Sequence, residues 1–266
     1  MTGTVYLVGA GPGAADLLTV RAARLLGEAD IVFHDALIGA GILSLAVKAQ
    51  KVPVGKRSGR HSTAQRFINK RLADAAHRHR VVVRLKGGDP MLFGRAHEEI
   101  SYLKQKSIKV EIIPGVTAAL AASAGLGVSL TRRGLARSVA FVTPRVGESE
   151  RPSNWVNAVA AADTAAIYMG TGEAAAIADA LIGAGKPPLL PVAVVENASL
   201  PDARVIAGTL AELPALAALA GGGPSVVLIG EVFETLRAQR YRPSTSGKVK
   251  PDGRAALSAR TASQSA

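Results

Sequence analysis

The chain has 266 residues, enough for one large domain or two domains of roughly 100–150 residues each. It contains no cysteine, which excludes disulfides, thiolate metal sites and a cysteine nucleophile. Although 48% of its residues are hydrophobic, no window approaches the roughly 18 consecutive apolar residues of a membrane span. The N-terminus also lacks the basic start of a signal peptide. We therefore expect a cytoplasmic protein with no membrane partner.

The formal net charge of +12 raises the question of a nucleic-acid partner. Residues 237–266 carry seven Lys/Arg and one acid, so half of the excess lies in the last thirty residues. The remaining +6 suits a polyanionic small molecule as well as RNA, and we expect no nucleic-acid partner. Residues 241–266 are rich in Ser, Gly and Pro with little apolar bulk, which predicts a disordered basic tail.

The first half of the chain alternates between two kinds of pattern. Short apolar, β-branched runs predict strands at 4–9, 30–35, 50–55, 80–87 and 109–113. Apolar residues at helical spacing predict helices between them, at 14–29, 63–79 and 95–107. In the second of these helices we expect Phe67, Ile68, Leu72 and Ala75 to face inward. Pro53 places the third strand at an edge. Strands that alternate with helices predict a parallel α/β sheet.

The pattern changes at Pro114 and Gly115, where we place a domain boundary. We expect a first α/β domain over residues 1–113 and a second over 114–240. An alanine-rich helix opens the second domain. Further strands are expected in "SVAFVT", "TAAIYMG", "PVAVVENAS", "ARVIAG" and "PSVVLIG", and some of these could pair antiparallel.

The first strand runs into "GAGPG", residues 9–13, which suggests a dinucleotide-binding loop with Asp35 as the ribose-binding acid. Two details argue against this. The last two glycines are two residues apart rather than three, and Pro12 removes an N–H where a pyrophosphate needs donors. The remaining interpretations are a plain tight turn and a turn that lets the edge of a substrate come close.

"KGGDP", residues 86–90, directly follows a buried strand. Ligands of open α/β sheets bind beyond the carboxyl ends of the strands. Gly87 and Gly88 lack a Cβ, so their backbone can touch a ligand directly, and Asp89 can accept hydrogen bonds from an ammonium or hydroxyl group. The alternative is a plain strand–turn–helix connection in which Asp89 caps the helix.

Several motifs occur in a fixed order across about 240 residues: "VGAGPG", "IVFHDAL", "VGKR", "RLKGGDPMLFGR", "PGVTAALAASAGLGVSLTRRGLA", "YMG" and "VVENAS". Taken together, they resemble the tetrapyrrole methylase family. Within it, "RLKGGDP" together with "GKR" and "YMG" is similar to the branch that methylates uroporphyrinogen-III on carbon to give precorrin-2. That product feeds sirohaem or cobalamin synthesis.

The resemblance implies an α/β fold of two domains that hold S-adenosylmethionine in the cleft between them, a homodimer, and no metal. Carried over by motif, the cofactor-binding residues are Pro12, Gly87, Gly88, Asp89, Leu92, Thr117, Ala118, Met169 and Ala198. The implied catalytic residues are Asp35 as proton acceptor and Lys56 as proton donor.

The chain departs from the family pattern in three short stretches, and local loop contacts can differ there: Ala14-Ala15, Ala96-His97 and Thr143-Pro144-Arg145. The third replaces a glycine-histidine turn of many members.

Arg132, Arg133 and Arg137 form a basic cluster beside the expected cleft. The cluster is either a solvated face or a site for substrate carboxylates, to which the fork of arginine is suited. Two other functions stay open. Net charge alone favours a ribosomal-RNA methylase of the same fold, and "GAGPG" alone favours a non-catalytic or NAD-linked Rossmann module.

Overall fold

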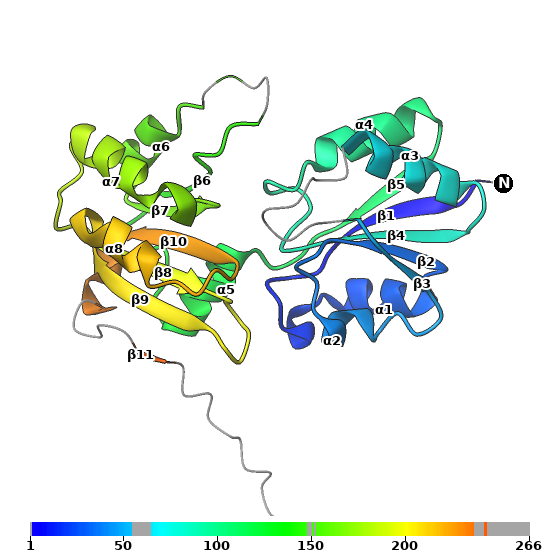
Figure 1. Ribbon diagram of the computed structural model, residues 1–266, viewed down its shortest axis with the longest axis horizontal. Helices are drawn as coiled ribbons and strands as arrows, with labels where there is room; N and C mark the ends of the chain where they lie inside the picture. The colour runs from blue at the N-terminus through cyan, green and yellow to red at the C-terminus, as the bar shows by residue number, and fades with distance from the viewer. Residues whose placement is uncertain (1, 55–64, 148–150, 152, 237–241, 244–266) are drawn as a thin grey trace, which may run out of the picture.

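The computed structural model describes residues 2–54, 65–147, 151, 153–236 and 242–243. Two β-sheets form, one from each half of the chain, and each carries helices on both faces (Figure 1). Lys56 lies outside the described residues. Among the described residues, no helix is long and apolar enough to cross a membrane.

The first sheet is parallel throughout, as the alternating pattern predicted. Its strands lie in the order β3-β2-β4-β1-β5. In chain order they are β1 (Thr4–Gly9), β2 (Ile31–His34), β3 (Gln50–Pro53), β4 (Val81–Lys86) and β5 (Lys109–Ile113). The strand that contains Pro53 is at an edge, where a missing ladder donor is tolerated.

Helices α1 (Val20–Glu28) and α2 (Ala40–Leu43) cover one face of this sheet, and α3 (Gln65–Ala76) and α4 (Ala96–Gln105) cover the other (Figure 1). The helix predicted over 14–29 begins later, at Val20, because the side chain of Thr19 caps it by accepting from the N–H of Ala22 at 3.2 Å. Upstream lies only a short 3₁₀ turn, η1 (Ala15–Leu17).

Phe67 does not face inward as predicted. Its side chain is half exposed on α3, and the guanidinium carbon of Arg66 lies 4.9 Å from the centre of its ring. The core on this face of the sheet is instead formed by Ile68, Leu72 and Ala75 of α3, together with apolar residues of β1, β2 and β4.

The second sheet is mixed, in the order β11-β9-β8-β10-β7-β6. Only β6 and β7 pair in parallel; the other pairs are antiparallel, which the sequence had left open. The strands are β6 (Val139–Val142), β7 (Thr164–Tyr168), β8 (Pro191–Glu196), β9 (Arg204–Thr209), β10 (Ser225–Gly230) and β11 (Arg242–Pro243). The two residues of β11 fall within the segment expected to be disordered, yet they pair with β9.

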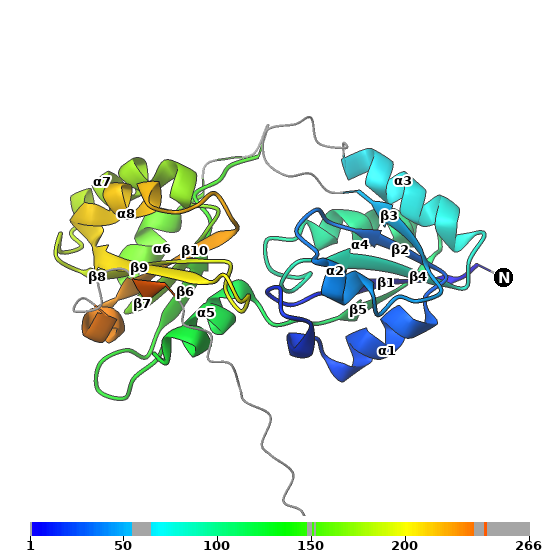
Figure 2. The ribbon, with the colours of Figure 1, turned by 60° about the horizontal axis from the view of Figure 1, so that its bottom comes forward.

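Two groups of helices sandwich the second sheet (Figures 1 and 2). One face packs on α5 (Ala118–Leu126) and the 3₁₀ helix η4 (Glu231–Leu236). The opposite face packs on α6 (Trp155–Ala161), α7 (Ala174–Gly183) and α8 (Leu213–Ala218), with η2 (Thr171–Glu173) and η3 (Leu210–Glu212) beside them. The chain passes from the first sheet to the second through residues 114–117, between β5 and α5.

Gly9, Gly88 and Gly115 pack against one another where the chain leaves the first sheet, and their lack of side chains allows three turns to come close. A Cβ on Gly115 would lie 2.3 Å from the carbonyl oxygen of Gly88 and 2.8 Å from the Cα of Gly9, closer than real Cβ atoms come. The backbones of Gly11 and Gly88 exchange two hydrogen bonds, of 3.2 and 2.8 Å. "GAGPG", "KGGDP" and "PGV" are thus one packed unit at the carboxyl ends of β1, β4 and β5.

Candidate functional site

A cavity of about 670 Å³ opens at this unit and is lined from both halves of the chain. The first half contributes the turns after β1, β2 and β4. The second contributes residues at or just after the ends of β5, β6, β7 and β8 and at the start of β10. Its volume lies in the usual range of small-molecule sites, and its position beyond the carboxyl ends of parallel strands is where open α/β sheets bind ligands.

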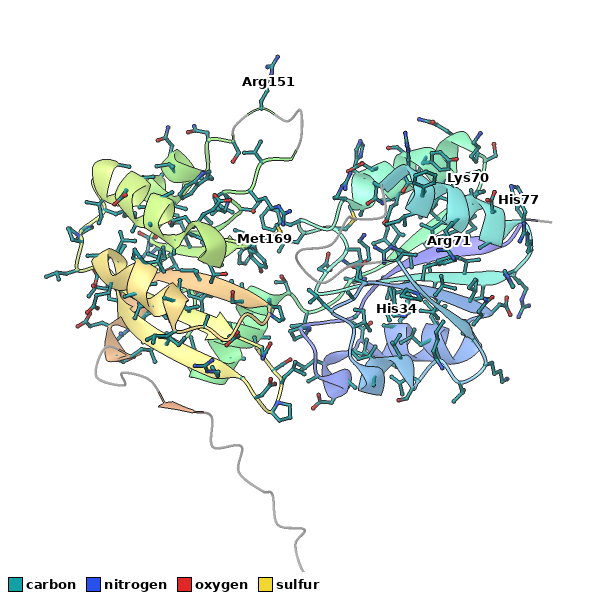
Figure 3. All side chains as sticks on the ribbon, in the orientation of Figure 1. His34, Lys70, Arg71, His77, Arg151 and Met169 are labelled. Carbon is teal, nitrogen blue, oxygen red and sulfur yellow. The ribbon has the colours of Figure 1, made fainter. Side chains whose placement is uncertain are left out.

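The structure brings together all nine residues predicted to bind the cofactor, and all of them line this cavity: Pro12, Gly87, Gly88, Asp89, Leu92, Thr117, Ala118, Met169 and Ala198. They are far apart in the sequence and come from both sheets. Figure 3 shows Met169 on the side of the second sheet that faces the first. Their contact with a cofactor stays a prediction.

Gly87 and Gly88 form a bare stretch of cavity wall. A Cβ on Gly87 would have no atom within 4 Å, so the space beside its backbone is open. Gly88 has a φ of +66°, which a residue with a side chain rarely adopts. The backbone can therefore meet a ligand directly, as the sequence predicted for this motif.

The carboxylate of Asp89 is held by two backbone groups. One oxygen accepts from the N–H of Met91 at 2.7 Å, and the other accepts from the N–H of Gly115 at 2.9 Å. Asp89 does not cap the next helix, because the N-cap of α4 is Arg95. The carboxylate thus fastens "KGGDP" to "PGV" and also faces the cavity.

Tyr168, which the sequence analysis left unassigned within "YMG", joins the two halves of the cavity. Its hydroxyl lies 2.7 Å from the hydroxyl of Thr117 and accepts from the N–H of Ala119 at 3.2 Å. Its ring centre is 5.1 Å from that of Phe93, which comes from the first half of the chain. Burial raises the pKa of Tyr168, so the phenol stays protonated.

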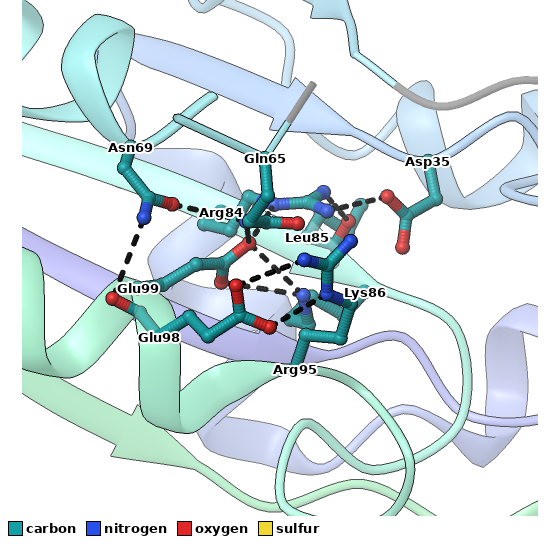
Figure 4. Close-up of polar contacts among 9 residues, drawn as sticks. All are labelled: Asp35, Gln65, Asn69, Arg84, Leu85, Lys86, Arg95, Glu98 and Glu99. Carbon is teal, nitrogen blue, oxygen red and sulfur yellow. Dashed lines mark hydrogen bonds and ion pairs between the residues drawn. The ribbon is translucent and has the colours of Figure 1, made fainter. Parts of the chain in front are cut away.

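Figure 4 shows an ionic network around Glu99, and Arg84 and Lys86 of this network also line the cavity. Arg84 and Lys86, both on β4, and Glu99, on α4, are at most 4% exposed. One nitrogen of the Arg84 guanidinium donates to Asp35 at 2.5 Å, and another donates to Glu99 at 3.1 Å. Burial, followed by the charge of Arg84, lowers the pKa of Lys86.

The predicted carboxylate-binding cluster does not line this cavity. Arg132, Arg133 and Arg137 are exposed on the loop between α5 and β6, where Arg132 pairs with Ala136. Arg145 does line the cavity, and no ion pair holds it to an acidic side chain of the described residues. It belongs to the stretch Thr143-Pro144-Arg145, where the chain departs from the family pattern.

Sequence reasoning missed several residues of the cavity wall, among them Arg84, Lys86, Phe93, Arg95, Arg145 and Tyr168. Two charged residues within the fully buried strand "VVVRLK" were a usable signal, because charges inside a core need partners. The start of β10 carries no such signal. In the described parts of the chain, no three His, Asp or Glu side chains are grouped so as to hold a metal ion.

Comparison with known proteins agrees with the motif pattern. The family model for Tetrapyrrole (Corrin/Porphyrin) Methylases matches residues 4–214. Siroheme synthase 1 of Cronobacter sakazakii is 42% identical over 233 residues, which are 87% of this chain and 49% of that protein. Siroheme synthase of Zymomonas mobilis is 42% identical over 231 residues, 86% of this chain and 49% of that protein. The chain spans about half the length of these curated relatives.

One solved structure matches this chain over the whole of its own length. Uroporphyrin-III C-methyl transferase from Thermus thermophilus, complexed with S-adenyl homocysteine, is 40% identical, with a TM-score of 0.77 over 88% of this chain and 100% of that one. That ligand is the demethylated form of the cofactor predicted from the motifs. The extent of the family match, together with this structural likeness, shows that the chain belongs to the tetrapyrrole (corrin/porphyrin) methylase family.

Proposed function

We propose that this chain uses S-adenosylmethionine to methylate uroporphyrinogen-III on two neighbouring pyrrole rings, giving precorrin-2 and two molecules of S-adenosylhomocysteine. The product would feed sirohaem synthesis, cobalamin synthesis or both. One observation carries the proposal. The nine motif residues, scattered between positions 12 and 198, converge on one cavity of suitable volume at the carboxyl ends of the first sheet. The likeness to siroheme synthases and to a uroporphyrin-III C-methyl transferase supports the substrate.

The cavity fits the cofactor on two counts. The open space beside Gly87 would be filled by any side chain, and the bare backbone there can donate to and accept from a polar ligand. Asp89 would hold an ammonium group, and Met169, Ala198 and Leu92 would contact its apolar parts. When bound, S-adenosylmethionine supplies an electrophilic methyl group on a sulfonium centre.

The protein's own part in the chemistry is positioning and proton removal. An electron-rich pyrrole carbon is itself the nucleophile, so the chain needs no covalent catalyst, and holding that carbon in line with the methyl group supplies most of the rate gain. A proton must then leave the methylated ring system. Asp35 is placed to accept it, because it lines the cavity and its Oδ2 has no hydrogen-bond partner among the described residues. Lys56, the proton donor implied by the motifs, lies outside the described residues.

The substrate carries eight carboxylates, and the cavity offers a cation for them. Arg84 is paired with Asp35 and Glu99, Lys86 with Glu99, and Arg95 with Glu98. Arg145 has no such acidic partner among the described residues, so its charge is available to a ligand. We therefore add Arg145 to the candidates for carboxylate binding. Arg132, Arg133 and Arg137 would reach a substrate only if it extends beyond the cavity or if a second subunit brings them close.

The competing function is a ribosomal-RNA methylase of the same fold, which only the net charge of +12 favours. Homodimerisation and a cytoplasmic location stay predictions. The test is to mix the chain with S-adenosylmethionine and enzymatically made uroporphyrinogen-III, under reducing conditions, and to follow the red fluorescence of oxidised precorrin-2. We expect fluorescence that depends on both reactants. If the chain converts neither S-adenosylmethionine nor uroporphyrinogen-III but binds ribosomal RNA tightly and in a salt-sensitive way, the alternative would replace this proposal.

A further inference from the structure

Glu99 is the most buried charge of the ionic network, and nothing in the proposed chemistry uses it. Glu99 lies on the buried face of α4, and it is 0% exposed. Oε1 accepts from Gln65 at 3.0 Å, from Arg84 Nε at 3.1 Å and from Lys86 Nζ at 3.1 Å, and Oε2 accepts from Lys86 at 3.2 Å. A carboxylate with this many donors is satisfied in the core, although burying it is unfavourable without them.

The position of Glu99 follows from the geometry of a strand beneath two helices. Arg84 and Lys86 are two residues apart on β4, so their side chains leave the sheet on the same face. That face is the one covered by α3 and α4. Two cations side by side repel each other, and Glu99 lies where it can accept from both (Figure 4). Glu99 is thus the anion that hydrogen-bonds both cations of this pair.

The guanidinium of Arg84 is fixed at every nitrogen. Nε donates to Glu99, one terminal nitrogen donates to the carbonyl of Leu85 at 3.1 Å, and the other donates to Oδ1 of Asp35 at 2.5 Å. Because the guanidinium is a rigid planar fork, the bond to Glu99 sets where the opposite corner of the fork lies. That corner is the group that holds Asp35.

Asp35 itself has little else to hold it. Its side chain is 29% exposed, and Arg84 is its one side-chain partner among the described residues. With Oδ1 bound to Arg84, Oδ2 is the oxygen left for a ligand. An accurately placed base needs a third group to orient it, as in other catalytic dyads and triads.

We propose that Glu99 is a positioning residue that acts through Arg84 to hold the carboxylate of Asp35 toward the cavity. The inference rests on the proposed function, in which Asp35 takes the proton from the methylated ring. Glu99 touches neither substrate nor cofactor. Its removal should therefore slow the proton-removal step and leave cofactor affinity nearly unchanged.

The test is a double-mutant cycle in the full chain with Glu99→Gln, Asp35→Asn and the double variant. Glu28→Gln is the matched control, because Glu28 lies on the surface of α1, over the opposite face of the sheet. Each variant is assayed for melting temperature, for S-adenosylhomocysteine affinity by calorimetry, and for turnover of uroporphyrinogen-III. We expect Glu99→Gln to lower kcat by about 10-fold or more, below the about 10²–10⁴-fold expected for Asp35→Asn. Affinity for S-adenosylhomocysteine should stay within about 2- to 3-fold, and the control should match the wild type.

The cycle distinguishes positioning from a general structural effect. If Glu99 acts through Asp35, the double variant should be no slower than Asp35→Asn alone. Losses that multiply, or a Glu99→Gln defect that appears equally in cofactor affinity, would overturn the inference. Glu99→Asp keeps the charge on a shorter arm, and we expect its kcat between those of the wild type and Glu99→Gln. If Glu99→Gln does not fold, a wild-type kcat in a folded Glu99→Asp variant would overturn the inference.

The same assays separate failure of this inference from failure of the proposed function. If the wild-type chain turns over the substrate and the kcat of Asp35→Asn is unchanged, the inference and the choice of base are overturned. The methyltransferase assignment would stand in that case. Absence of turnover in the wild-type chain would overturn the proposed function, and the inference with it.

Discussion

At the scale of single residues, the site depends on what glycine lacks and on what buried charges need. Gly87 leaves open the space beside its backbone, and Gly88 takes a left-handed conformation that a side chain would strain. Both could be predicted from the sequence, because two glycines directly after a buried strand indicate a turn or a close approach to the backbone. Arg84 and Lys86 could have been predicted too, since a charge within a buried strand implies a partner. The identity of that partner could not, because Glu99 is contributed by another element.

The variant Gly87→Val tests the cofactor assignment most cleanly. A Cβ there would have no atom within 4 Å, and Gly87 lines the cavity, so we expect the fold to be kept and ligand space to be lost. We expect a melting temperature close to that of the wild type and no measurable heat of S-adenosylhomocysteine binding in calorimetric titration. Unchanged affinity would show that the bare wall does not contact the cofactor.

The change Asp35→Asn tests the proposed base. It preserves size and removes the proton acceptor, so we expect kcat to fall by about 10²–10⁴-fold with cofactor affinity little changed. Turnover within a few-fold of wild type would make Asp35 a structural partner of Arg84 and nothing more.

At the scale of elements, the parallel sheet was predictable from alternating strand and helix patterns, while several details were not. Phe67 has the spacing of a core residue but lies on the surface under Arg66, because α3 already fills the core with Ile68, Leu72 and Ala75. The antiparallel pairs of the second sheet depend on which strands meet in space, and apolar runs alone do not encode that. The packing of the turns "GAGPG", "KGGDP" and "PGV" against one another likewise depends on the tertiary fold.

The close packing of these three glycine turns predicts that a side chain at Gly115 lowers the stability of the fold. In Gly115→Ala the new methyl group would meet the backbones of Gly88 and Gly9, so the turns must move apart. We expect a loss of about 1–3 kcal/mol in the free energy of unfolding. Gly27→Ala is the matched control, because a methyl group there meets nothing within 4 Å, and it should stabilise α1 by about 0.5–1 kcal/mol. Denaturant unfolding measures both, and equal effects would contradict this close packing.

At the edge of the second sheet, the contribution of Asp163 to stability is expected to depend on pH. Asp163 accepts from the N–H groups of Arg137 and Ser138 and from the Ser138 hydroxyl, and these bonds lower the pKa of its carboxyl below the ordinary 3.8. Its folded pKa is the lower one, so its stabilising contribution is complete above pH 3.8 and is lost as pH falls through the folded value. The melting-temperature advantage of the wild type over Asp163→Asn should therefore shrink below pH 3.8. An advantage that does not change with pH would contradict this assignment.

At the scale of the whole molecule, the basic charge divides between the cavity, the exposed loop and the last residues of the chain. The sequence motifs were sufficient to predict an α/β fold with two sheets and nine of the residues that line the cavity. They were not sufficient to place the substrate's carboxylates. Clustering along the chain suggested Arg132, Arg133 and Arg137, but only folding shows that Arg145 reaches the cavity wall and that these three do not.

Substrate kinetics separate the two placements. If Arg145 binds a carboxylate, Arg145→Ala should raise the KM for uroporphyrinogen-III by up to about 10-fold, a modest factor because the side chain is exposed. The KM for S-adenosylmethionine should change little. Arg133→Ala serves as the comparison, since its side chain lies outside the cavity lining. A larger effect from Arg133→Ala would favour the exposed cluster and a substrate that spans two subunits.

We propose that this cavity transfers methyl groups to a tetrapyrrole and not to RNA. A competition experiment tests it most directly: the chain receives S-adenosylmethionine labelled in its methyl group, with uroporphyrinogen-III and ribosomal RNA present together, and the label is traced in both. We expect two labelled methyl groups in each product tetrapyrrole, none in RNA, and loss of all transfer in Gly87→Val. Label in RNA, or transfer that persists in Gly87→Val, would contradict the account.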